Sequence, residues 1–238
     1  MSEAQPAAPD AARPDVPALG PRALAFLVGS GAIFALYSFG YDLWKLPPQV
    51  VAFGPFGRTL VGDVLPMLVA PLLAARFVLG IPLAAVGVRA RPVGPMLRAA
   101  LLAWLAVLPV AAWLAFQPAV REFYPSPHFP PAREHAVGLV VLWAVLHAPQ
   151  LASVELLYRG YLLQPLARRF GFERAAAFVV APYVLLHWTK PAPELWLAAW
   201  GGLAFSWAAW RTRSFWPGFL AHWLTAVTVD ALCFVQLR

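Results

Sequence analysis

Long apolar runs, separated by short basic or proline-containing stretches, follow one another along most of this 238-residue chain. A helix needs about 20 apolar residues to cross a lipid bilayer. Runs of roughly this length predict membrane helices at about 22–41, 60–82, 97–116, 173–188, 195–210 and 215–236. The pattern therefore predicts an all-α protein: a polytopic membrane helix bundle with seven or eight membrane helices, in one membrane domain over residues 21–238.

One more apolar run, at about 137–167, is too long for a simple crossing, because a helix of that length would extend about 45 Å. Pro149 lies inside it and removes a backbone hydrogen-bond donor. We expect a kink or break there, followed by a helix over about 151–168. If every helix crossed the membrane simply, Glu155 and His187 would lie at different depths in it. A break at Pro149, or a strong tilt of the helix, is expected to bring these two residues to one depth.

Composition supports a membrane protein. The chain is 61% hydrophobic and only 12% charged, whereas soluble domains are about 45–50% apolar and about 25% charged. Residues 1–20, rich in Ala, Pro and Asp, lack the apolar stretch of a signal peptide and predict a disordered tail. The single cysteine, Cys233, allows no disulfide within the chain.

The formal net charge of +7 comes mainly from residues between the apolar runs. Such residues set membrane topology, so we expect membrane lipids as partners and no nucleic acid. With seven crossings, ten basic residues fall on the N-terminal side and six on the other, which favours a cytoplasmic N-terminus.

Charged residues inside apolar sequence are the candidates for chemistry. Glu155 and Arg159 are four residues apart, so on a helix they share one face and can pair. A carboxylate in an apolar cavity is suited to act as a general base, with its pKa balanced by burial and by the arginine. The alternative is a buried ion pair that only holds helices together.

Other polar residues follow in the C-terminal part. His222 lies deep in the last helix, with Asp230 a little over two turns later, and His187 ends an earlier apolar run. Lys190 and Glu194 flank a Pro-Ala-Pro turn. A divalent metal at Glu155, His187 and His222 is a weaker alternative, because no His-Glu-x-x-His pair is present.

Three motifs resemble the CAAX-protease and bacteriocin-processing family of intramembrane endopeptidases, which includes the type II CAAX prenyl protease. Glu155-Leu-Leu-Tyr-Arg159 is close to its Glu-Glu-x-x-x-Arg motif, with Val154 in place of the first Glu. Tyr183-Val-Leu-Leu-His187 resembles Phe-x-x-x-His. The stretch up to His222 resembles the approach to His-x-x-x-Asn/Asp, with Ala226 at the last position. The similarity covers about 137–236.

The resemblance implies peptide hydrolysis within a membrane cavity, without a cofactor. Glu155 and His187 would activate water, His222 with Asp230 would stabilise the oxyanion, and Arg159 would orient Glu155. A similar bacterial branch has a His-x-x-Lys-Pro-x-x-Glu turn and an Asp eight residues after the last His, which Lys190, Glu194 and Asp230 match. Tyr158, Lys190 and Glu194 are therefore expected to give substrate or structural support.

The expected substrate is a membrane-anchored protein or peptide, and the expected location is the bacterial inner membrane. The alternative is a catalytically inactive relative that binds such substrates or acts as a scaffold, which the departures at Val154 and Ala226 favour. A small-molecule transporter is disfavoured because the sequence shows no internal repeat.

Overall fold

The computed structural model describes residues 19–43, 54–89, 93–124 and 137–236, and every regular element among them is helical. Most of the predicted N-terminal tail lies outside these residues. The N-terminal helices are α1 (Pro21–Leu43), α3 (Gly54–Thr59), η1 (Leu60–Val69), α4 (Ala70–Leu73), η2 (Ala74–Val78), η3 (Leu83–Val86), α5 (Val93–Ala115) and α6 (Pro118–Phe123). The C-terminal ones are α7 (Val137–Glu155), η5 (Leu156–Leu162), α8 (Leu163–Phe170), α9 (Phe172–Leu185), α10 (Pro193–Thr212) and α11 (Trp216–Gln236).

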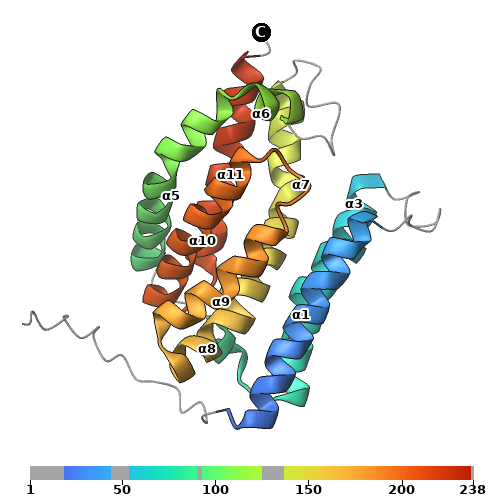
Figure 1. Ribbon diagram of the computed structural model, residues 1–238, viewed down its shortest axis with the longest axis vertical. Coiled ribbons are helices and arrows are strands. Elements are labelled where there is room, and N and C mark those ends of the chain that lie inside the picture. Colours follow the sequence, from blue (N-terminus) through green and yellow to red (C-terminus); the bar gives the residue numbers. More distant parts are fainter. Residues whose placement is uncertain (1–18, 44–53, 90–92, 125–136, 237–238) are drawn as a thin grey trace, which may run out of the picture.

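The helices form one elongated bundle (Figure 1). On one side α1 packs against η1, and on the other side α5 packs against α10 and α11. The continuous helix α7–η5–α8 lies between them and contacts both groups. This central helix carries Glu155 and Arg159, so the bundle buries them completely.

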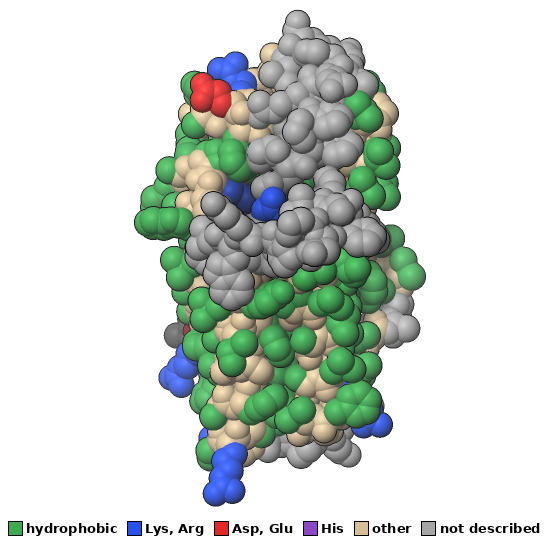
Figure 2. Space-filling model, turned by 90° about the vertical axis from the view of Figure 1, so that its right-hand side faces the viewer, with side chains coloured by type: hydrophobic (Ala, Val, Ile, Leu, Met, Phe, Trp, Pro, Cys, Tyr) green, Lys and Arg blue, Asp and Glu red, His purple; other side chains and the backbone are tan. Residues whose placement is uncertain are grey.

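The outer surface fits a lipid environment. Large apolar side chains stand exposed, among them Leu36 at 67% and Phe77 at 76%. Figure 2 shows hydrophobic side chains covering much of one face, with Lys and Arg side chains at its lower end. A water-soluble monomer rarely exposes so much contiguous apolar surface. The chain is therefore an integral membrane protein.

Five helices in the described part of the chain are long and apolar enough to cross a membrane. They are Pro21–Ser38, Gly57–Val78, Val93–Ala115, Val137–Phe170 and Trp216–Gln236. The all-helical membrane fold is confirmed, whereas the total of seven or eight crossings stays a prediction. The predicted span at 173–188 is instead the 14-residue α9, which is about 21 Å long, shorter than the roughly 30 Å hydrocarbon core.

Of the kink or break expected at Pro149, the break is wrong, while the kink stays a prediction. Helix α7 continues through Pro149 to Glu155, and the change comes later, where the helix widens into the π-helical η5. In an apolar setting every backbone polar group that leaves a helix must find another partner, so losing one hydrogen bond at a proline costs less than ending the helix. Wider π-helical turns occur frequently at functional sites.

Gly160 in η5 allows the turn around η3 to approach the central helix. A Cβ atom at this position would lie 2.6 Å from the backbone carbonyl oxygen of Val86. Gly160→Ala is therefore expected to lower the free energy of unfolding by about 1–3 kcal/mol, since backbone must move to make room. Thermal unfolding in detergent checks this expectation.

Gly138→Ala is the matched control, because a Cβ there would meet nothing within 4 Å. It is expected to leave stability unchanged or to raise it by up to about 1 kcal/mol. Equal unfolding midpoints for the two variants would contradict the close approach at Gly160.

Candidate active site

Glu155 and Arg159 form a buried ion pair at the junction of α7 and η5. Both side chains are 0% exposed, and Arg159 Nε lies 3.3 Å from Glu155 Oε2. Arg159 Nη2 donates to the carbonyl oxygen of Gly202 at 3.4 Å, and its guanidinium lies over the Tyr183 ring at 4.0 Å. These contacts fix the arginine, which in turn holds one oxygen of the carboxylate.

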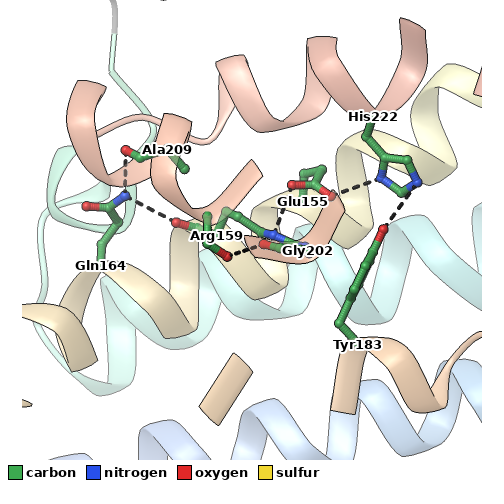
Figure 3. A network of polar contacts seen from close by, with 8 residues as sticks. Glu155, Arg159, Gln164, Tyr183, Gly202, Ala209 and His222 are labelled. Atoms are coloured by element: carbon green, nitrogen blue, oxygen red, sulfur yellow. Dashed lines mark hydrogen bonds and ion pairs between the residues drawn. The ribbon is translucent and has the colours of Figure 1, made fainter. Parts of the chain in front are cut away.

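The other carboxylate oxygen contacts His222 from α11. Glu155 Oε1 and His222 Nδ1 are 2.9 Å apart, and His222 Nε2 is 3.4 Å from the Tyr183 hydroxyl (Figure 3). A carboxylate only accepts hydrogen bonds, so the proton of a neutral His222 lies on Nδ1. The Nε2 atom then carries the free electron pair.

Gly218 lets α11 come this close to Glu155. A Cβ atom at residue 218 would lie 2.8 Å from Glu155 Oε2. His222, one turn further along α11, thereby reaches the other carboxylate oxygen.

His187 lies in the turn after α9. Its Nδ1 atom is 3.0 Å from the carbonyl oxygen of Tyr183, and the two rings are in edge contact. Since a carbonyl cannot donate, Nδ1 carries the proton here too, and Nε2 is free to accept. Burial, and secondly the charge of Lys190, lower the pKa of His187 well below its usual value. The imidazole is thus neutral at ordinary pH.

A cavity of about 70 Å³ connects the two histidines with a second polar cluster. Its polar lining residues are Tyr124, His147, Tyr183, His187, Lys190, Glu194, His222, Thr225 and Asp230. That volume holds a few water molecules. The carboxylate of Glu155 lies behind His222, fully buried.

The second cluster joins Lys190, Glu194 and Tyr124. The Tyr124 hydroxyl donates to Glu194 Oε2 at 2.9 Å, and Lys190 Nζ lies 3.5 Å from the same oxygen. Lys190 Nζ also donates to the Tyr124 hydroxyl at 3.3 Å. Burial, and secondly the Glu194 charge, raise the pKa of Tyr124 well above its usual value, so the phenol keeps its proton.

Most of the residues singled out in the sequence converge on this region. His187, His222, Asp230, Lys190 and Glu194 line the cavity. Behind it lie Glu155 and Arg159, whereas Tyr158 is fully buried in the apolar core, in edge contact with the Tyr183 ring. The direct histidine partner of Glu155 is His222, while His187 bonds the Tyr183 carbonyl.

Val154 and Ala226, the two positions at which the sequence departs from the family motifs, have different surroundings. Val154 packs in the apolar core, away from the lining of the cavity. Ala226 does line the cavity, together with Asp230 one turn further along α11. Asp230 is only 5% exposed. A carboxylate therefore remains on this wall of the cavity, one turn from the expected position.

Sequence reasoning missed Tyr124, Gly202 and Gly218. Tyr124 lies directly after α6, inside a proline-rich stretch that has no apolar periodicity, so nothing in the pattern ties it to Glu194. Gly202 contributes through its backbone carbonyl, and Gly218 through the absence of a side chain. The Gly201-Gly202 pair was a visible signal, because small residues allow close helix approach in membranes.

No group of three or more His, Cys, Asp or Glu side chains in the described ranges lies close enough together to hold a metal ion. Both oxygens of Glu155 already face His222 and Arg159. This arrangement gives the metal alternative at Glu155, His187 and His222 no support.

Fold and site together define a polytopic membrane protein with a buried Glu–Arg–His centre beside a small polar cavity. Residues 136–228 match the family model described as type II CAAX prenyl endopeptidase Rce1-like. The resemblance of the three motifs to this endopeptidase family is thereby confirmed, over 93 of the 238 residues. Neither the curated proteins nor the solved structures include a match to the chain.

Proposed function

We propose that the protein is an intramembrane endopeptidase that hydrolyses a peptide bond of a membrane-associated protein, prenylated or with an unmodified C-terminal tail, in the inner membrane of a bacterium. The observation that carries this proposal is the Glu155–His222 pair, in which Glu155 holds the Nδ1 side of the imidazole and His222 lines a polar cavity inside an apolar bundle. The family match of the same segment supports it.

The geometry favours His222 as the general base. Water in the cavity gives a proton to Nε2 as its oxygen attacks the peptide carbonyl carbon, and the resulting imidazolium is stabilised by the Glu155 carboxylate at 2.9 Å. The same proton then passes to the leaving amine nitrogen as the C–N bond breaks. The contact with Arg159 orients the Glu155 carboxylate.

Other lining residues would complete the site. Neutral His187 accepts a hydrogen bond from the attacking water through Nε2. The Tyr183 hydroxyl and the Lys190 ammonium are donors on the cavity wall, suited to the oxyanion of the tetrahedral intermediate. Asp230 lies on the same helix as His222 and contributes to the polarity of that wall.

Purified protein in detergent or vesicles, incubated with membrane-anchored tail peptides, tests the proposal. Cleavage is expected, independent of prenylation of the anchor or enhanced by it, and unaffected by a metal chelator. Peptide binding without any cleavage would contradict the proposal and would favour the non-catalytic scaffold, an alternative that Val154 supports by packing in the apolar core.

Removing the Lys190 charge is expected to change the pH dependence of cleavage. Lys190 lowers the pKa of His187, so Lys190→Met lets that pKa rise. Protonation of His187 then begins at higher pH, and the acid-side fall of kcat/KM moves to higher pH. Lys190→Arg keeps the charge, so the acid side of its pH profile of kcat/KM should match that of the wild type. Identical acid limbs for wild type and Lys190→Met would rule out this influence of Lys190.

A further inference from the structure

Three arginines from separate parts of the chain gather at one end of the bundle. Arg89 follows η3, Arg168 is in the last turn of α8, and Arg213 lies between α10 and α11. The segments that carry these arginines adjoin one another, since α8 packs against both η3 and α10.

Backbone contacts hold these segments together. The N–H of Phe215 donates to the carbonyl oxygen of Gly87 at 3.3 Å, which joins the α10–α11 turn to the turn carrying Arg89. The Gln164 amide donates to the carbonyl oxygen of Ala209 at 3.1 Å, which joins α8 to the end of α10. Gly87 has a φ of +82°, and a Cβ atom there would lie 3.1 Å from the backbone nitrogen of Phe215. Glycine therefore suits this position. The fold itself therefore enforces the cluster.

Arg89 is held by a contact within its own turn, and Arg213 has an unusual backbone conformation. Arg89 Nε donates to the carbonyl oxygen of Ala84 at 2.7 Å. Arg213 has a left-handed backbone, with φ 52°, and no other non-glycine residue of the described ranges has a positive φ. L-residues adopt this conformation at a cost, and glycine is the usual choice. Arg213 therefore stands at a position where glycine would be less strained.

We propose that Arg89, Arg168 and Arg213 bind the phosphate of an anionic phospholipid headgroup. Guanidinium groups match phosphate oxygens with paired hydrogen bonds. The lipid source is favoured over free phosphate because two exposed aromatic side chains suit the glycerol and acyl region. Phe170 ends α8 and is 41% exposed, and Trp216 begins α11 and is 40% exposed. The cytoplasmic leaflet, where this end is expected, carries the anionic lipids.

The test uses the full chain purified in a neutral detergent. Binding of phosphatidylglycerol is measured by native mass spectrometry and by the shift of the thermal unfolding midpoint, against phosphatidylcholine and inorganic phosphate. We expect saturable binding and stabilisation by phosphatidylglycerol alone. Equal stabilisation by phosphatidylcholine would overturn the proposal, and so would displacement of phosphatidylglycerol by inorganic phosphate, which would indicate a soluble phosphate ligand.

Arg213→Gly separates the effect on lipid binding from the effect on stability, because glycine adopts the left-handed backbone conformation without steric strain. Without lipid, its unfolding midpoint should equal or exceed that of the wild type, while its affinity for phosphatidylglycerol falls about fivefold. Arg168→Gln should weaken binding similarly, and Arg121→Gln in α6, outside the cluster, should not. Undiminished affinity in both cluster variants would refute the site.

Discussion

Glu155→Gln is expected to abolish cleavage and to lower the free energy of unfolding by about 3–5 kcal/mol. The amide keeps the shape of the side chain but removes the charge that offsets Arg159, and both residues are 0% exposed. An arginine left buried without its counter-charge carries an uncompensated desolvation cost. Activity falls because His222 loses the carboxylate that orients it and stabilises its protonated form. Denaturant or thermal unfolding and peptide cleavage, measured side by side, check both parts.

The double variant Glu155→Gln/Arg159→Met separates catalysis from structure. It removes both charges, so stability should largely return, whereas cleavage should not. Glu173→Gln at the exposed start of α9 is the matched control and should alter neither property. Recovered cleavage in the double variant would show that Glu155 and Arg159 serve only as a structural ion pair.

His222→Gln is expected to lower kcat/KM about 10²–10⁴-fold, the range typical for loss of a general base. The side chain is 14% exposed and borders the cavity, so the glutamine is accommodated and stability should change little. Steady-state kinetics with a membrane-anchored peptide, together with the unfolding midpoint, provide the measurement.

Tyr183→Phe is the variant with which the loss of kcat/KM in His222→Gln is compared. It removes only the hydroxyl, whose contact with His222 Nε2 is a long 3.4 Å. A hydrogen bond of that length is weak, and the Lys190 ammonium remains as a second donor for the oxyanion, so we expect a smaller loss of kcat/KM than in His222→Gln. A His222→Gln variant with wild-type kcat/KM would assign the general base to another residue, with His187 the first candidate.

Much of this fold could be predicted from the sequence, because a membrane restricts the backbone structures that a chain can form. Apolar runs in lipid must form helices, so the all-helical fold follows from the pattern. Charges kept inside such runs are expensive, so Glu155, Arg159 and His222 stood out without any structure. The pairing of the segments before and after Gly171 was also encoded, since Glu155 and His187 each lie sixteen residues from this turn between α8 and α9.

The expectation of a kink or break at Pro149 leaves this symmetry out. A helical hairpin places residues at equal distances from its turn at equal heights, and the cation–π contact of Arg159 with Tyr183, each twelve residues from Gly171, follows this rule. Helix α9 then ends within the bundle because it has only 14 residues. His187, Lys190 and Glu194 consequently line the cavity.

Composition and local spacing were enough to predict the helical membrane fold, the candidate residues and the family resemblance. Which histidine contacts Glu155 follows from the packing of the helices and not from local sequence. That choice depends on how far each helix is rotated about its axis and how closely α11 approaches at Gly218. The same holds for Tyr124 and the arginine cluster, which unite residues from elements distant in the chain. Such contacts are set by packing across the whole bundle, and no local pattern of residues encodes them.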